Sequence, residues 1–229
     1  MALAIFPPVY PILDAAFLPQ DFALRSETLA RLVASLAEAG VEILQYRNKQ
    51  DSEAEILRDT EVMRSAAPPS LRLVLNDYAH LVAKTGFNGV HLGQTDLPPR
   101  EARELVGPDI LIGVSTHNEV QVRFAALQPV DYIAIGPVYG TTSKANPDPV
   151  VGLDGIHLAR RLTTLPVVAI GGITLNDAPK VWGAGANSVA VISAIFTAGV
   201  DPAHAASGFL GVFEKLSSEF PLKETAKMN

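Results

Sequence analysis

Eight short apolar runs recur along this chain, and helix-like stretches separate each run from the next. The runs are Val9–Leu13, Glu42–Gln45, Leu71–Leu75, Gly89–Leu92, Ile110–Val114, Tyr132–Ile135, Val167–Ile170 and Ser188–Ile192. Such alternation is typical of βαβ units joined into a parallel sheet, whose ligands bind at the carboxyl ends of the strands. Polar, charged or glycine residues cluster where most runs end, so the sequence predicts a site built from many strand ends.

The helix-like stretches carry start and stop signals. They span Glu27–Ala39, Glu53–Ser65, Tyr78–Thr85, Pro99–Val106, Glu119–Leu127, Ile156–Leu162, Ala178–Gly183 and Asp201–Phe220. The residues expected to start three of them are Ser26, then Asp51 or Ser52, then Asn176 or Asp177. The glycines that fall where helices should end are Gly40, Gly86, Gly107 and Gly185.

Eight strand–helix pairs in a chain of 229 residues predict a (β/α)8 TIM barrel with its active site on the carboxyl-end face. Because such barrels routinely run to about 200 to 250 residues as one unit, we expect a single domain over residues 1–229. Its core should extend from about residue 9 to about residue 220. A doubly wound open sheet is the alternative, since periodicity alone does not show closure.

Composition excludes several classes of function. The 18 basic and 24 acidic residues give a net charge of −6, which argues against nucleic acid or an anionic membrane as a partner. The absence of cysteine excludes disulfides, thiolate metal sites and cysteine nucleophiles. The segment Met1–Leu13 lacks the features of a signal peptide, so we expect a cytoplasmic protein. Whether it forms a homo-oligomer stays open.

Glycines and a serine after the last two runs suggest an anion site. Gly171 and Gly172 follow the seventh run and Ser193 follows the eighth, where many barrels bind phosphate through bare backbone N–H groups and a short helix N-terminus. The alternative is that the paired glycines only make a tight loop. Two such features on neighbouring strands favour phosphate.

Two carboxylates are expected to share one rim. Asp77 follows the third run and Asp96 follows the fourth, so adjacent strands would bring them together. Magnesium is usually held by one or two carboxylates plus waters and substrate phosphates. The alternative is that Asp77 caps the next helix and Asp96 stabilises a turn.

Cationic and hydroxyl side chains complete the predicted pocket. Gln45, Arg47 and Lys49 share parity, so they should point to one face. The cluster Thr141-Thr142-Ser143-Lys144 adds hydroxyls and a third cation, which together suit a pyrophosphate. A solvated loop lysine is the alternative for Lys144. Either histidine, at position 91 or 117, fits an acid–base role and a structural role equally well.

Taken together from Val9 to Ile195, the clusters resemble those of the thiamine phosphate synthase family. The matching segments are Gln45–Lys49, Asn76–Asp77, Gly89–Asp96, Gly113–His117 and Gly136–Tyr139. The resemblance implies a (β/α)8 barrel that joins an aminopyrimidine methyl diphosphate to a thiazole phosphate, with release of pyrophosphate. It also implies Mg2+ as cofactor, small molecules as the only substrates, and a dissociative reaction in which pyrophosphate leaves first.

The resemblance also assigns residue roles. Gln45 contacts the pyrimidine, Tyr10 also binds substrate, and Asp77 and Asp96 ligate magnesium. The residues implied to hold the diphosphate are Arg47, Lys49, Asn76, Ser115 and Lys144, of which Arg47, Lys49, Ser115 and Lys144 are expected to be catalytic. The residues implied to bind the thiazole phosphate or neighbouring groups are Thr141, Ser143, Gly172, Ile192 and Ser193.

Four positions depart from the family's usual residues. Asn48 stands in place of Glu, Tyr78 in place of Arg, Ser143 in place of Thr and Ser188 in place of Gly. Two rival functions stay open: a thiazole tautomerase of the same fold that uses a histidine, and a phosphate-ligand sensor without catalysis. The retained cations and aspartates favour the synthase over both rivals.

Overall fold

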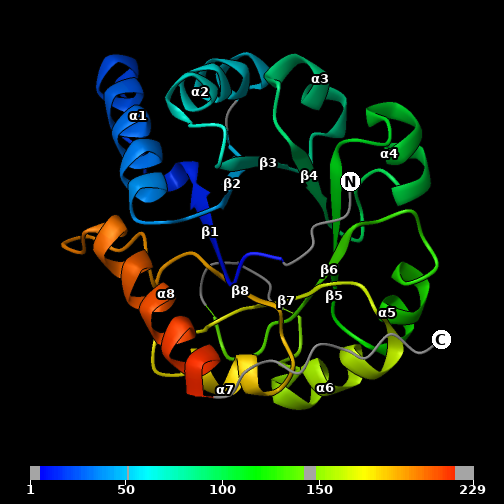
Figure 1. The fold of residues 1–229 in the computed structure, drawn as a ribbon. Helices are drawn as coiled ribbons and strands as arrows, with labels where there is room; N and C mark the ends of the chain where they lie inside the picture. The colour runs from blue at the N-terminus through cyan, green and yellow to red at the C-terminus, as the bar shows by residue number, and fades with distance from the viewer. Residues whose placement is uncertain (1–5, 51, 142–147, 220–229) are drawn as a thin grey trace.

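The computed structural model describes residues 6–50, 52–141 and 148–219, and its eight parallel strands form a closed barrel inside a ring of helices (Figure 1). The strands pair in chain order, and β8 pairs with β1 to close the sheet. They are β1 (Val9–Asp14), β2 (Ile43–Arg47), β3 (Arg72–Asn76), β4 (Gly89–Leu92), β5 (Leu111–Thr116), β6 (Tyr132–Ile135), β7 (Val167–Ile170) and β8 (Ser188–Val191). Closure of the sheet confirms the predicted barrel and excludes the alternative of a doubly wound open sheet.

The helices follow the strands around the ring. They are α1 (Phe22–Glu38), α2 (Glu53–Ala66), α3 (Val82–Thr85), α4 (Pro99–Val106), α5 (Glu119–Ala125), α6 (Gly152–Leu162), α7 (Ala178–Gly183) and α8 (Pro202–Glu219), with 3-10 turns η1 (Ala15–Phe17) and η2 (Ala79–Leu81). Gly86 and Gly107 cap α3 and α4 with positive φ, as expected. No helix in the described ranges is both long and apolar enough to cross a membrane.

Three predicted helix starts are wrong. Helix α3 begins at Val82 and not at Tyr78, because Ala79–Leu81 form the 3-10 turn η2. Helix α1 begins at Phe22, because the Asp21 carboxylate accepts a hydrogen bond from the backbone N–H of Leu24, whereas Ser26 lies inside the helix. Helix α6 begins at Gly152 and not at Ile156. For α2, Ser52 is the cap, and it forms a reciprocal capping box with Glu55. The alternative cap, Asp51, lies outside the described residues.

Alternation along each strand separates two apolar layers. Side chains such as Leu44 and Tyr46 of β2 pack outward against the helices, in a layer that includes most buried aliphatic residues. Their neighbours point into the barrel, where Phe6, Tyr10, Ile12, Ile43, Val74, Tyr132, Ala134, Val168 and Ala190 form a smaller core. The pocket described below lies over this inner core, whose packed side chains form its floor.

A buried charged network lies on the outer face of β2. The Arg25 guanidinium donates to both carboxylate oxygens of Asp59, and the Tyr46 hydroxyl donates to the same carboxylate. The Asn48 amide donates to the Tyr46 hydroxyl at 2.9 Å. Asn48, one of the four departures, therefore extends a network that ties α1 and α2 to the loop after β2.

Candidate active site

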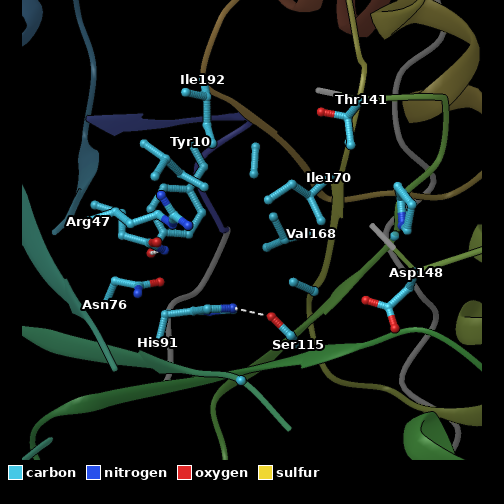
Figure 2. A pocket seen from close by; sticks show the side chains of 18 of the residues that line it. Tyr10, Arg47, Asn76, His91, Ser115, Thr141, Asp148, Val168, Ile170 and Ile192 are labelled. Carbon is cyan, nitrogen blue, oxygen red and sulfur yellow. Dashed lines mark hydrogen bonds between the residues drawn. The ribbon is translucent and has the colours of Figure 1, made fainter. Parts of the chain in front are cut away.

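One cavity of about 450 Å³ opens at the carboxyl ends of the strands. Twelve of the fourteen residues predicted to bind substrate or metal line it: Tyr10, Gln45, Arg47, Lys49, Asn76, Asp77, Asp96, Ser115, Thr141, Gly172, Ile192 and Ser193. Figure 2 shows Arg47 and Asn76 on one side of the cavity and Thr141 and Asp148 on the opposite side. Ser143 and Lys144 lie outside the described residues. The fold thus brings side chains from widely separated clusters into one pocket.

The ends of β2 to β4 form the charged half of the pocket, made of Arg47, Lys49, Asp77 and Asp96. Gln45, Arg47 and Lys49 all line the cavity, which confirms their predicted shared face. Arg47 forms an ion pair with Asp14 at the end of β1, and Lys49 forms one with Asp77. Both cations are therefore held at the mouth of the barrel by carboxylates that the neighbouring strands supply.

The two predicted metal ligands lie side by side. Burial raises the pKa of Asp77 to about 6, and Asp96, which is within hydrogen-bonding reach, adds to the rise while Lys49 opposes it. Asp96 also accepts a hydrogen bond of 2.6 Å from the backbone N–H of Gly93, so it does hold its turn. Among the described residues no three acidic or histidine side chains gather. Two adjacent carboxylates fit magnesium, which completes its shell with waters and phosphate oxygens.

Asp77 adopts a backbone conformation that is unusual for its type. Its φ is +69°, the left-handed region, where asparagine and aspartate are the best tolerated residues after glycine. Its backbone N–H donates to the carbonyl of His91 on β4 at 2.8 Å. The turn after β3 is therefore fixed to β4, which places the Asp77 carboxylate over the pocket.

A chain of hydrogen bonds, here called the interior chain, crosses the barrel beneath the pocket. Gln45 donates to the Tyr10 hydroxyl at 3.1 Å, and the hydroxyls of Tyr10 and Tyr132 lie 2.9 Å apart. His91 Nδ1 lies 3.1 Å from the Tyr132 hydroxyl, and its Nε2 lies 2.9 Å from Ser115 Oγ (Figure 2). Burial lowers the pKa of His91 to about 4, against the nearby charge of Asp96, so the ring is neutral at neutral pH.

Asn76 lines the pocket and has one buried polar atom without a partner among the described residues. Its amide nitrogen Nδ2 is buried and has no hydrogen-bond partner in the structure, although the residue lines the cavity. A buried amide donor without a partner costs about 1–3 kcal/mol. The predicted ligand role of Asn76 depends on its place in the cavity wall and stays a prediction.

The ends of β6 to β8 form the backbone half of the pocket, made of Gly136, Gly171, Gly172 and Ser193. Gly171 and Gly172 have φ values of +101° and +65°. A Cβ on Gly172 would overlap the Gly140 carbonyl oxygen and lie 2.9 Å from Tyr139 Cβ. A turn closed by the Phe196 N–H on the Ile192 carbonyl at 2.9 Å follows β8. This half offers bare backbone and hydroxyls where the other offers charges.

His117 has a carboxylate neighbour that the sequence did not indicate. Its Nδ1 donates to the Gly136 carbonyl at 2.6 Å, and its Nε2 lies 3.4 Å from Asp148 Oδ2. All three residues line the cavity. Asp148 belongs to the long segment between β6 and α6, and no motif spacing relates it to His117, so only the fold could reveal the pair.

Comparison with known proteins identifies the family. The family model described as thiamine monophosphate synthase matches residues 10–195. The chain belongs to that family. A thiamine-phosphate synthase of Koribacter versatilis is 48% identical over 206 residues, covering 90% of this chain and 95% of the relative. One of Albidiferax ferrireducens is 39% identical and covers 81% of this chain and 85% of the relative.

A solved structure supports the same family. The thiamine phosphate pyrophosphorylase of Pyrococcus furiosus superposes with a TM-score of 0.78 at 26% identity, covering 91% of this chain and 96% of that one. These matches confirm the family predicted from the clusters, and with it a synthase of the transferase class. They do not test the individual site residues, whose roles stay predictions.

Three of the four departures from the thiamine phosphate synthase pattern can be located. Asn48 is in the buried network on β2. Tyr78 lies with Leu97 and Leu105 in a groove that Lys49, Asp77 and Asp96 of the charged half also line. Ser188 is fully buried, and its hydroxyl has no partner in the structure. Ser143 lies in the segment that the structure does not describe.

Proposed function

We propose that this pocket joins an aminopyrimidine methyl diphosphate to a thiazole phosphate, giving thiamine phosphate and pyrophosphate. The observation that carries the proposal is the facing arrangement of the charged half and the backbone half across one cavity. A diphosphate with a metal ion suits the first half and a single phosphate suits the second. Close relatives named thiamine-phosphate synthase support the assignment.

In the charged half, Asp77 and Asp96 would hold Mg2+, whose bound charge would stabilise negative charge that develops on the diphosphate. Arg47 and Lys49 would bind the diphosphate oxygens, and Lys144 would join them from outside the described ranges. Asn76 would donate its unpaired amide hydrogens, and Ser115 its hydroxyl hydrogen, to the same oxygens. The side chains of Arg47, Lys49, Asn76 and Ser115 would thus orient the leaving group and stabilise its negative charge.

On the other side, Gly172, Ile192 and Ser193 would hold the thiazole phosphate through backbone N–H groups and the serine hydroxyl. Thr141 and Ser143 would bind that phosphate or a neighbouring group. Gln45 would contact the pyrimidine. Tyr10, which was predicted to bind substrate, lines the cavity and hydrogen-bonds Gln45, so it would act in part through that residue.

The reaction needs positioning and charge stabilisation more than a nucleophilic side chain. The carbon–oxygen bond of the pyrimidine methyl diphosphate breaks, and its electron pair leaves with pyrophosphate. The resulting cation accepts the lone pair of the thiazole nitrogen, which forms the new carbon–nitrogen bond. Because one cavity of about 450 Å³ would hold both substrates, the thiazole nitrogen would already lie near the cation when it forms and would capture it quickly.

The direct test is to mix the protein with both substrates and magnesium, and to follow thiamine phosphate and pyrophosphate with and without a chelator. Equal, magnesium-dependent formation of both products supports the synthase. The pairing of His117 with Asp148 inside the pocket favours tautomerisation as the second candidate. Isomerisation of a thiazole carboxylate phosphate without the pyrimidine substrate would support that candidate, and tight binding without any turnover would indicate a sensor.

The remaining expectations follow from the same assignment. We propose small-molecule substrates as the ligands, a cytoplasmic location, and one catalytic domain over residues 1–229. Charge and composition support the absence of nucleic acid and membrane as partners. Sedimentation of the purified protein would decide whether it forms a homo-oligomer.

A further inference from the structure

The interior chain links two walls of the pocket through the barrel. Its ends, Gln45 and Ser115, both line the cavity, while Tyr10 and Tyr132 between them are at most 1% exposed. The members come from β1, β2, β4, β5 and β6. Because each hydrogen bond holds one proton, the direction of donation at one end constrains the direction at the other.

The direction can be followed from Gln45. Its amide donates to Tyr10, so the Tyr10 hydroxyl hydrogen must go to Tyr132, the other partner that the structure gives it. The Tyr132 hydrogen then goes to His91 Nδ1. A hydroxyl turned the other way would leave a buried donor unsatisfied, which costs about 1–3 kcal/mol.

The neutral His91 ring therefore carries its proton on Nε2. That N–H donates to Ser115 Oγ, so the Ser115 hydroxyl hydrogen is released from the chain and can point into the pocket. With its proton on Nε2, His91 cannot accept the Ser115 proton. The arrangement thus differs from a serine–histidine nucleophile pair, in which the imidazole must be the acceptor.

We propose that the interior chain couples recognition of the pyrimidine amino group at Gln45 to hydrogen-bond donation by Ser115 toward the departing diphosphate. Tyr10, Tyr132 and His91 act as positioning residues. The coupling to catalysis rests on the proposed synthase reaction, whereas the direction of hydrogen-bond donation along the interior chain does not. With its amide nitrogen used on Tyr10, Gln45 has its carbonyl oxygen left to accept a hydrogen bond, which suits an amino group.

The reverse direction follows when position 45 can only accept. Tyr10 would then donate to residue 45, Tyr132 to Tyr10, and His91 Nδ1–H to Tyr132. His91 Nε2 would accept from Ser115, which would lose its donor toward the pocket. A ligand that presents an acceptor in place of the amino group would favour this state by turning the Gln45 amide over. A ligand with the amino group therefore keeps Ser115 as a donor to the leaving group, and a ligand without it does not.

The test is the tautomer of His91 in the ligand-free protein, measured by NMR with 15N-labelled histidine at mildly alkaline pH. The chain has five histidines, and the His91 signals are those missing from a His91→Gln variant. We expect the Nε2–H tautomer in the wild type and in Gln45→Met, which cannot accept strongly from Tyr10. Gln45→Glu, whose carboxylate only accepts, should switch His91 to Nδ1–H.

Three outcomes overturn the inference. An Nδ1–H tautomer in the wild type contradicts the direction, and this holds even if Gln45→Glu does not fold. The same tautomer in the wild type and in a folded Gln45→Glu variant contradicts the coupling. In a Tyr132→Phe background the Gln45→Glu substitution should no longer move the tautomer, and a switch that persists there shows another route. Because no substrate is present, none of these results depends on the synthase assignment.

A double-mutant cycle tests the coupling to catalysis. Ser115→Ala should lower kcat in the wild type by a larger factor than in Tyr132→Phe, because that variant no longer fixes the direction of His91. Ser188→Ala removes a fully buried hydroxyl that is not part of the interior chain, and it serves as the matched control. In that background Ser115→Ala should lower kcat by the same factor as in the wild type. Equal factors in all three backgrounds would contradict the coupling and leave the synthase reaction intact.

Discussion

The two halves of the pocket recognise anions by different physical means. In the charged half, Arg47, Lys49, Asp77 and Asp96 bring side-chain charges together at the ends of β2 to β4. In the backbone half, Gly171 and Gly172 bring bare main chain close to the cavity, at φ values that other residues rarely adopt. Charge can therefore be removed from one half without altering the backbone, whereas the other half is sensitive to a single added methyl group.

The largest effect is expected from Asp77→Asn. Asparagine tolerates the positive φ of this position, so the substitution removes charge while it keeps the turn. Turnover should fall by about 10²- to 10³-fold through loss of metal binding. Steady-state rates across a magnesium titration measure this, with the exposed Asp109→Asn as the control. A variant with a normal rate and a normal magnesium requirement would return Asp77 to a purely structural role.

The next largest effect is expected from Gly172→Ala in the backbone half. The added Cβ would overlap the Gly140 carbonyl oxygen, and the φ of +65° disfavours alanine, so the loop must shift. We expect kcat/KM for the thiazole phosphate to fall by about 10- to 100-fold, the cost of one or two weakened hydrogen bonds to an anion.

Binding of the pyrimidine diphosphate to Gly172→Ala, measured by calorimetry with magnesium, should stay unchanged. Gly183→Ala is the matched control, because nothing lies within 4 Å of the Cβ that it would add. If Gly172→Ala weakened both substrates equally, the division of the pocket into two independent halves would be wrong.

A pH titration should separate the halves further. The pKa of Asp77 is raised to about 6, so the folded protein holds this proton below that pH and a metal ion must displace it. Magnesium affinity should therefore fall by about tenfold per pH unit below about pH 6 and level off above it. Calorimetry in buffers of matched ionic strength checks this, and Asp77→Asn should flatten the curve.

The same raised pKa gives a stability prediction of definite sign. The proton on Asp77 stabilises the metal-free fold below the ordinary aspartate pKa, and this contribution is lost as the pH rises through about 6. Urea unfolding of the metal-free protein should show Asp77→Asn gaining stability relative to the wild type over that range. A constant difference between the two proteins from acid to neutral pH would contradict the raised pKa.

The smallest effect is expected from Asp14→Asn. Asp14 forms the ion pair with Arg47 and also caps η1 through a 2.9 Å bond from the Ala16 N–H, which asparagine can keep. Loss of the charge should raise KM for the pyrimidine diphosphate by about two- to fivefold, as for a partly exposed ion pair. Asp21→Asn, at the cap of α1, is the control. An equal rise in KM for the thiazole phosphate would indicate a general loosening of the barrel mouth.

Sequence reasoning located most residues of the charged half and the backbone half of the pocket, but little of the interior chain beneath them. The glycine pair and the parity of Gln45, Arg47 and Lys49 were predictable, because alternation and strand-end position are local properties. Tyr132 was assigned only to an apolar run, and His91 was left between two roles. Their hydrogen bond joins positions 41 residues apart in the chain, a separation at which no local pattern operates.

The helix starts show the same limit on a smaller scale. Ser26 was a reasonable cap by type, but Arg25 beside it is drawn inward to Asp59 on α2, which places that turn inside α1. The true cap, Asp21, precedes an apolar residue that gave no helix signal. The Asp21 cap sets the start of α1 five residues before the predicted one, and the ion pair of Arg25 with Asp59 then holds this first turn against α2.

The sequence by itself determined the alternation of strands and helices, the family, and which residues crowd the carboxyl-end face, because each follows from the period of apolar residues and from what ends each run. Closure of the sheet and the order of its strands came from the tertiary structure. Only the tertiary structure decided the partners: Asp14 for Arg47, Asp148 for His117, and the interior chain from Gln45 to Ser115. The physical reason is that a hydrogen bond depends on distances of a few tenths of an ångström between strands far apart in sequence, and closure of the barrel sets those distances.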